Sequence, residues 1–277
     1  MSKFSRTAAL AVAALAFVAG AAHAQSAPAV SPSNPGVAQS GPDAILANAG
    51  LSYSGDVHAG TGYQFRGADF SNNGPSVGGT FTLQHTSGVF GSVSVDTVNL
   101  EPAEHKGDRS WQAFTDVKLG YTKNVAGVQL AGGLSQYDFE GAGGMGNLAF
   151  TEAFADAAWK GVDLQVNHNI AGASNEVAGE SRGDTYAQLS YTLPVGDYVH
   201  VPVLDKVSLG GDLGYTWYGN KHASASDNLS LAQLRVGYAV TPKIDVTLTH
   251  ELGYAHAAYT GGNSADNDTM LSGTLKF

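Results

Sequence analysis

The chain has 277 residues, of which only 14% are charged, with 36 glycines, 12 tyrosines and a net charge of −10. This acidic balance argues against a nucleic-acid partner, because nucleic-acid-binding proteins neutralise phosphates with clustered bases. The absence of cysteine excludes disulfides, and no apolar run beyond residue 24 reaches the roughly 18 residues that a membrane helix needs. The remaining way to cross a bilayer is a closed β-barrel, whose strands pair their backbone polar groups with their neighbours.

Residues 1–24 have the pattern of a secretory signal peptide. Lys3 and Arg6 form a basic start, residues 8–22 are almost entirely apolar, and Ala22-His23-Ala24 matches a small-x-small cleavage site. Cleavage after Ala24 would remove two bases and no acid, so the net charge would become −12. Residues 25–54, which are rich in Pro, Ala and Ser, are predicted to form a flexible periplasmic leader.

Residues 55–277 alternate between apolar and polar side chains, which predicts an all-β protein: a transmembrane, antiparallel, up-and-down β-barrel of about 12 strands. The connections alternate between short turns and loops rich in Gly, Asn, Asp and Ser, as expected for periplasmic turns and outer loops. The long connection near residues 195–205 is the exception among the turns. The expected strands are 55–66, 76–86, 88–98, 110–122, 127–138, 149–160, 161–171, 184–194, 206–218, 229–240, 243–256 and 267–277.

Aromatic residues on the expected lipid face gather at the strand ends, with aliphatic residues between them. Two such aromatic girdles are typical of membrane barrels. A soluble two-sheet sandwich would show the same alternation, but its aromatics need not cluster by strand end. The outer group is Tyr63, Phe65, Trp111, Tyr215, Trp217 and Tyr254, and the periplasmic group is Tyr121, Trp159, Tyr191, Tyr238 and Phe277.

The segment Tyr63-Gln64-Phe65-Arg66-Gly67, followed by a second strand that begins with Pro75 and ends near His85-Thr86-Ser87-Gly88, carries a family resemblance. It resembles the proteobacterial TorF or Gcw_chp type of outer-membrane porin over about residues 60–95. The third strand departs from the family pattern at Ser92–Asp96. The resemblance implies an outer-membrane location and a pore-like role, and it supplies no substrate.

Other motifs point to no catalytic, cofactor or metal site. Gly141–Gly146 matches G-x-G-x-x-G, but strands flank it on both sides, so it is interpreted as a loop rather than a dinucleotide site. His250-Glu251 opens a zinc-protease pattern that fails because Tyr254 replaces the second histidine. Neither His168 nor His250, both expected to face lipid, has a same-face serine two residues away, and no G-x-S-x-G elbow occurs. A barrel lipase is therefore the weaker alternative, and no enzyme, cofactor or metal is expected.

The expected inward face is polar and carries more acids than bases. Charged side chains that line a narrow bore set selectivity in pores, and the acidic excess predicts a modest preference for cations. We therefore expect passive diffusion of small hydrophilic solutes or ions, with a sealed structural or adhesive barrel as the alternative. The inward residues singled out are Arg66, Asp96, Asp116, Lys118, Glu152, Asp156, Asp212, Arg235, Asp245 and Glu251.

The chain ends on an alternating strand, Leu271–Phe277, with its final aromatic residue on the apolar face. A terminal phenylalanine of this kind resembles the signal read by the machinery that inserts such barrels. The expected partners are therefore outer-membrane lipid, the barrel-assembly machinery and small hydrophilic solutes, with no nucleic acid. The oligomeric state does not follow from the sequence.

Overall fold

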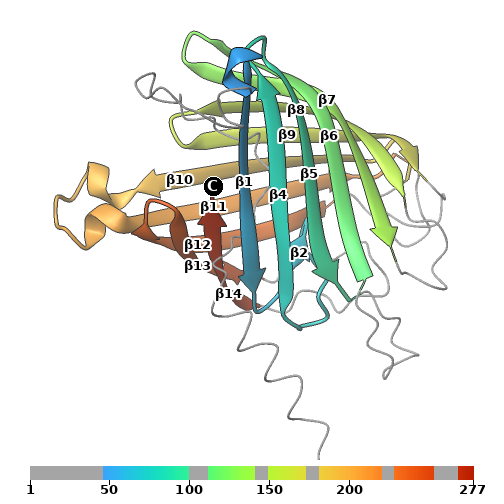
Figure 1. Cartoon of the computed structure of the whole chain (residues 1–277). Helices are drawn as coiled ribbons and strands as arrows, with labels where there is room; N and C mark the ends of the chain where they lie inside the picture. The colour runs from blue at the N-terminus through green and yellow to red at the C-terminus, as the bar shows by residue number, and fades with distance from the viewer. Residues whose placement is uncertain (1–45, 100–111, 141–148, 173–180, 220–227, 253–267) are drawn as a thin grey trace, which may run out of the picture.

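The computed structural model describes residues 46–99, 112–140, 149–172, 181–219, 228–252 and 268–277. Twelve strands form one closed barrel in which every neighbouring pair is antiparallel (Figure 1), as the alternation predicted. These strands are β1 (Leu51–Gly60), β4 (Ser76–His85), β5 (Val89–Val98), β6 (Gln112–Val125), β7 (Val128–Glu140), β8 (Phe150–Trp159), β9 (Val162–Gly172), β10 (Thr185–Pro194), β11 (Val207–Trp217), β12 (Asn228–Thr241), β13 (Ile244–Glu251) and β14 (Thr269–Lys276).

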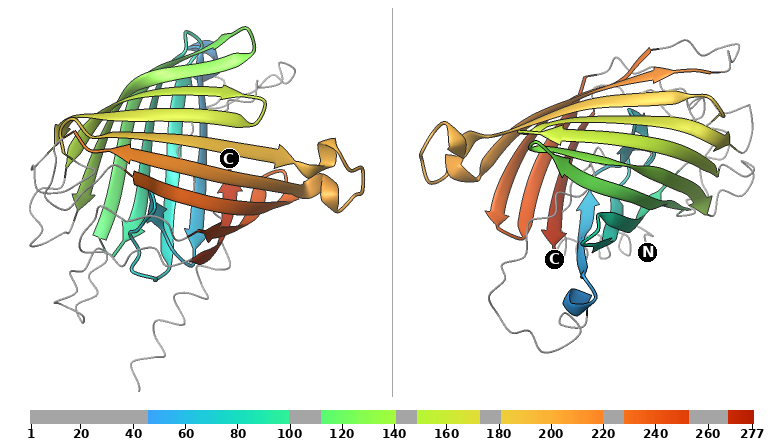
Figure 2. Two further views of the ribbon diagram at one scale, coloured as in Figure 1. Left: turned by 180° about the vertical axis from the view of Figure 1, so that it is seen from behind. Right: turned by 90° about the horizontal axis from the view of Figure 1, so that it is seen from above.

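The connections differ between the two ends of the barrel, which we call the turn end and the loop end. At the turn end, the short connections use left-handed backbone at Gly88, Gly127 and Gly161, where glycine avoids the strain a side chain would add. The connection between β10 and β11 is longer and contains two 3-10 turns, η2 (Val195–Asp197) and η3 (Leu204–Lys206). It projects beyond the rest of the barrel (Figure 2). The start of β1 and the end of β14 also lie at the turn end.

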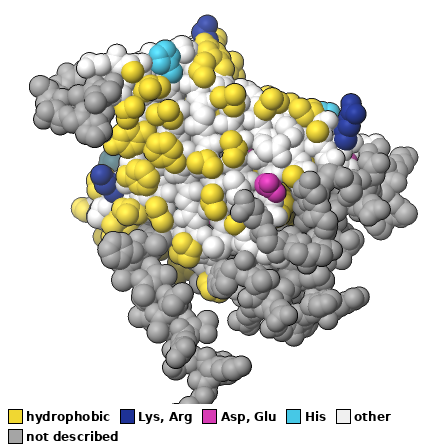
Figure 3. Space-filling model, turned by 45° about the vertical axis from the view of Figure 1, so that its right-hand side comes forward, with side chains coloured by type: hydrophobic (Ala, Val, Ile, Leu, Met, Phe, Trp, Pro, Cys, Tyr) yellow, Lys and Arg dark blue, Asp and Glu magenta, His cyan; other side chains and the backbone are white. Residues whose placement is uncertain are grey.

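The outer surface of the wall is aliphatic. Leu119, Leu134, Leu213 and Leu234 each expose about half or more of their side chains, at 65%, 49%, 53% and 55%. On the face shown in Figure 3, hydrophobic side chains cover the wall and the few Lys and Arg side chains lie toward its margins. In the described residues, no helix is long and apolar enough to cross a membrane.

The inward surface is polar, because alternate residues of each strand point to opposite faces. Buried polar side chains recur on successive strands, and many are charged. They include Ser76, Thr82, Asp96, Asp116, Ser135, Glu152, Asp156, Gln165, Asn167, Gln188, Asp212, Thr249 and Glu251. A closed wall with an aliphatic outside and a polar inside has the surfaces of a transmembrane barrel.

The prediction for the first strand was wrong. The expected strand 55–66 is replaced by β1 at Leu51–Gly60, so the wall begins inside the predicted leader. After Gly60 the chain leaves the wall and forms a small two-stranded sheet, β2 (Gln64–Phe65) and β3 (Ala68–Asp69), inside the barrel. The alternation of apolar and polar residues continues from β1 into β2. This pattern alone therefore does not distinguish a wall strand from a segment inside the lumen. We call residues 61–75 the lumen hairpin.

Candidate functional site: the barrel lumen

Acids and bases in the lumen are paired, either across neighbouring strands or along one strand. Arg235 of β12 contacts Asp212 of β11 through both Nε and Nη2, at 2.8 and 2.9 Å, and the Gln233 amide donates to the same carboxylate at 2.6 Å. Lys118 lies 3.4 Å from Asp116 on the same strand. These pairs satisfy buried charges that would be costly alone.

The pair nearest the turn end is more open to water. Lys276 of β14 contacts Asp245 of β13, and the Lys276 side chain is half exposed. An exposed pair contributes little to stability, because water screens it. This pair therefore acts mainly as local charge at the rim of the lumen.

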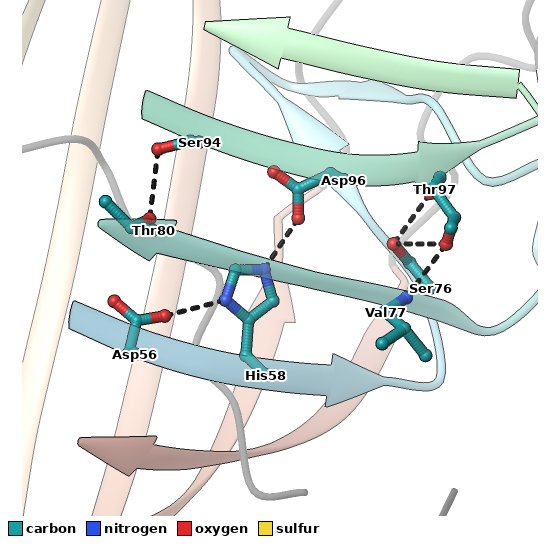
Figure 4. Close-up of polar contacts among 8 residues, drawn as sticks. All are labelled: Asp56, His58, Ser76, Val77, Thr80, Ser94, Asp96 and Thr97. Atoms are coloured by element: carbon teal, nitrogen blue, oxygen red, sulfur yellow. Dashed lines mark hydrogen bonds and ion pairs between the residues drawn. The ribbon is translucent and has the colours of Figure 1, made fainter. Parts of the chain in front are cut away.

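A histidine lies between two carboxylates on the inner wall. His58 Nδ1 lies 2.9 Å from Asp56 Oδ1, and Nε2 lies 2.6 Å from Asp96 Oδ1 (Figure 4). Carboxylates only accept hydrogen bonds, so both contacts are satisfied at once only when both ring nitrogens carry hydrogen. His58 then supplies a fixed positive charge between Asp56 and Asp96.

The reach of His58 depends on a glycine in the intervening strand. His58 of β1, Gly78 of β4 and Asp96 of β5 lie side by side in register. A methyl group on Gly78 would lie 2.0 Å from Asp96 Oδ1 and 2.6 Å from His58 Nε2. Only glycine leaves room for this contact across β4. Asp96 was among the expected inward residues, whereas Asp56 and His58 were not. The inward position of these two residues follows from the alternation, but the contact of His58 with Asp96 depends on the strand register.

The lumen hairpin is built from tight turns. Arg66 and Gly67 join β2 to β3 with positive φ angles of 54° and 84°, the pattern of a two-residue type I′ turn. Asp69 organises the next turn: its carboxylate accepts hydrogen bonds from the Ser71 and Asn73 amides at 2.8 and 2.6 Å. These local bonds fix the shape of the hairpin.

An aromatic cluster attaches the hairpin to the inner face of strands β5 to β8. The Phe65 and Phe70 rings of the hairpin lie 5.0 and 5.8 Å from the ring of Phe114, in edge-on contacts. Such pairs contribute about 0.5–1.5 kcal/mol each beyond the area they bury. The buried cluster consists of Phe65, Ala68, Phe70, Val98, Phe114, Tyr137, Phe139 and Phe150, with Tyr63 packed against it.

Arg66 at the hairpin tip contacts the far side of the barrel. Its two Nη atoms lie 2.7 and 2.5 Å from the two carboxylate oxygens of Glu152 on β8, a bidentate pair. The guanidinium also lies over the Tyr186 ring of β10, 4.7 Å from its centroid. The hairpin hangs between β1 and β4, and the order of strands places β8 and β10 on the opposite wall. The lumen hairpin therefore crosses the whole bore.

The inward polar side chains near the hairpin have little contact with water. Ser135, Asn169 and Glu251 are 0% exposed, and Thr249 and Glu152 are 1% exposed. A wide aqueous channel would wet these side chains, because they point into the bore from the wall. These side chains in the loop-end half of the lumen are therefore covered, and no wide aqueous channel runs past them in this structure.

The ten expected inward residues all lie on the lumen side. Arg66 does so from the hairpin rather than from a wall strand. Asp96, Asp116, Glu152, Asp156, Asp212 and Glu251 are buried, Lys118 and Arg235 pair with acids, and Asp245 is partly exposed. Arg66, Asp116 and Glu152 lie in one region, whereas Asp212 and Arg235 form a separate pair on another part of the wall.

The aromatic residues fall at the strand ends with one group of exceptions. Tyr121, Trp159, Tyr191, Tyr238 and Phe277 lie outward at the turn end, and Tyr215 and Trp217 lie outward at the loop end. The assignment of Tyr63 and Phe65 to the lipid face was wrong, because both belong to the lumen hairpin and pack in the aromatic cluster. Trp111 and Tyr254 lie outside the described residues.

Two outward histidines pair with hydroxyls of adjacent strands. His168 Nδ1 lies 2.8 Å from Thr185 Oγ1, and His250 Nδ1 lies 2.9 Å from Thr269 Oγ1. A nucleophilic triad also needs a third group that orients the histidine. Within the described part of the chain, no acid or amide contacts the second ring nitrogen of either histidine, so these pairs have the geometry of cross-strand contacts.

Comparison with known proteins gives one family and several similar structures. A family described as "bacterial protein of unknown function (Gcw_chp)" matches residues 44–226. No curated protein matches the chain. Outer membrane phospholipase A from Escherichia coli is 12% identical with a TM-score of 0.41, and the match covers 84% of this chain and 96% of that one. The COG4313 outer membrane channel from Pseudomonas putida F1 is 17% identical with a TM-score of 0.42, over 81% and 95% of the two chains. At such low identities and TM-scores, the likeness carries no argument about activity.

Proposed function

The chain belongs to the Gcw_chp family of bacterial proteins of unknown function, and we propose that it forms an outer-membrane channel for small hydrophilic solutes or ions. The observation that carries this proposal is the contrast between the two faces of one closed wall. The outside is aliphatic, and the inside is lined by charged and hydroxyl side chains on successive strands. A polar interior is what an aqueous passage needs, and twelve strands enclose a wider bore than the eight-stranded barrels that side chains fill.

The charges of the bore favour cations. The bases Lys118, Arg235 and Lys276 each pair with an acid. Asp56 and Asp96 share the single positive charge of His58, and Asp163 adds a partly exposed inward carboxylate with no base within ion-pair distance among the described residues. Fixed carboxylates in a low-dielectric bore raise the local concentration of cations, so a modest cation preference accompanies the channel.

We also propose a route of export and assembly, which residues 1–24 and the C-terminal strand support. Cleavage after Ala24 would release the protein into the periplasm, and residues 25–50 would form a leader there, with the turn end facing the same compartment. The C-terminal strand β14 and Phe277 would be recognised by the barrel-assembly machinery. The outward aliphatic wall would contact outer-membrane lipid.

Purified protein in a planar bilayer tests this proposal. Discrete conductance steps with a reversal potential on the cation side are expected, and the same protein should fractionate with the outer membrane and migrate differently on gels before and after heating. Recovery of the protein in the soluble periplasm would contradict the membrane location.

The alternative is a sealed structural or adhesive barrel that acts through its outer loops. The lumen hairpin favours it, because a bore that is permanently filled conducts nothing. Absence of conductance from a folded barrel that lacks the hairpin would decide for this alternative.

A further inference from the structure

We propose that the lumen hairpin is a gate, and that the contact between Arg66 and Glu152 is the latch that holds it closed. This inference rests on the proposed channel function and concerns how the channel is regulated. Residues 61–75 cross the bore, and Arg66 joins their tip to the wall opposite their point of attachment.

The hairpin is not needed to build the wall. Gly60, the last residue of β1, and Ser76, the first residue of β4, are direct partners in the ladder. A two-residue turn therefore suffices to join these strands, whereas the chain inserts 15 residues between them. The role of the inserted residues therefore lies in the lumen rather than in closing the wall.

The hairpin has a fixed base and a separable tip. At the base, the Thr61 amide donates to the Leu271 carbonyl at 3.0 Å, and the Asn99 amide donates to the Phe70 carbonyl at 2.7 Å. At the tip, Arg66 contacts Glu152 and Tyr186 through its side chain, and the neighbouring Phe65 ring packs against Phe114 and Tyr137. Loss of the Arg66 contacts therefore removes the charged part of the attachment and leaves the apolar packing of Phe65 and Phe70, so the hairpin can move on its base while its internal turns persist.

The latch pairs the charges of Arg66 and Glu152, each of which would be energetically costly to bury alone. Glu152 is 1% exposed, and the Arg66 side chain is 12% exposed. Breaking a buried pair by removing one partner leaves the other uncompensated, which strongly disfavours the arrangement that buries it. Replacement of Arg66 therefore penalises the closed state, and in the open state water reaches Glu152.

Single-channel recording on the full-length protein tests the gate with four forms. The wild type should open rarely. Arg66→Gln should open at least about tenfold more often, because the closed state then buries an unpaired carboxylate. Arg66→Lys keeps the charge but loses the bidentate fork and should lie between the two. Replacement of residues 61–75 by Asn-Gly should give a barrel that stays open.

The Arg235→Gln variant distinguishes an effect on the latch from a general effect of removing positive charge from the bore. Arg235 also forms a double contact with a lumen carboxylate, but both partners belong to the wall. This variant should alter ion selectivity without raising the opening frequency. An equal rise in opening for R235Q and R66Q would overturn the latch.

The same recordings distinguish failure of the gate from failure of the channel. A wild type that conducts continuously, with the step size of the hairpin deletion, would overturn the gate and leave the channel function intact. A deletion variant that folds, as shown by heat-modifiable migration, but never conducts would overturn the channel function itself.

Discussion

The ring of Phe277 covers the bare α-carbon of Gly55 on the outside of the barrel. The two residues exchange backbone hydrogen bonds, with N···O distances of 3.1 and 3.0 Å. A methyl group on Gly55 would lie 2.6 Å from Cζ of Phe277. The last residue of the chain therefore completes the contact between the first and last strands, both through its backbone and by covering a glycine with its ring.

Replacement of Phe277 by alanine should lower the heat-modifiable, folded fraction several-fold, because the ring that covers Gly55 is lost at the closing contact. Leu271→Ala is the matched control, since Leu271 lies on the same strand, faces outward and is 50% exposed against 51% for Phe277. Gel migration before and after heating measures both variants. An equal loss in the two would mean that only general outer hydrophobicity matters.

Replacement of Gly78 by alanine should destabilise the barrel by about 1–3 kcal/mol, because the new methyl group forces His58 and Asp96 apart. Gly91→Ala is the control, since a methyl group at that β5 position would meet its nearest atom, the Lys118 carbonyl oxygen, at 3.8 Å. Denaturant unfolding in detergent or lipid measures the difference. Similar stability for the two variants would show that the Asp56–His58–Asp96 contact contributes little.

Replacement of Asp116 and Asp212 together by asparagine should shift the reversal potential in a salt gradient toward anions. These acids lie beside Lys118 and Arg235, whose charges would then be uncompensated in the bore. The shift should shrink as salt rises, because the screening length falls to about 10 Å or less above 0.1 M.

The control for this selectivity change is D197N/D205N. It removes two acids from the exposed connection between β10 and β11, so the net charge changes equally while the bore is untouched. A shift as large as that of the lumen variant would place the determinant of selectivity outside the bore.

Trp159 and Trp217 should each report a depth near the membrane interface. Trp159 lies at the turn end and Trp217 at the loop end, and they are 51% and 44% exposed. With the other two tryptophans replaced by phenylalanine, each should be quenched more strongly by lipids labelled near the headgroup than by lipids labelled near the bilayer centre. Stronger quenching from the centre would contradict the position of the girdles.

The wall was largely predictable from sequence, because eleven of its strands alternate along most of their length. Register shifts interrupt the pairing only locally, between β8 and β9, β11 and β12, and β12 and β13. The lumen hairpin was not. Tyr63 and Phe65 fall on the same alternate positions as the outward residues of β1, so their sequence pattern is identical to that of a lipid-facing strand. Only the pairing of Gly60 with Ser76 shows that the wall closes without them.

The candidate site was predictable in its composition but not in its contacts. Alternation alone places Asp96, Asp116 and Glu152 on the inner face. Lys118 meets Asp116 on the same strand, but whether a base meets Asp96 or Glu152 depends on the register of segments far apart in the chain. Arg66 lies 86 residues from Glu152 in the sequence, and no local pattern joins them.

The pairing between β1 and β14, which closes the barrel, is shorter than the pairing between β1 and β4. The C-terminal segment, β14 with Phe277, pairs with the chain along Gly55–Thr61, whereas β4 pairs with all of Leu51–Gly60. When neighbouring strands are pulled apart, β1 should therefore separate from β14 before it separates from β4. Leu51–Ser54 extend past the chain's final residue, so this strip of sheet edge can accept a strand from elsewhere, and the place where the ring closes is also where it is easiest to reopen.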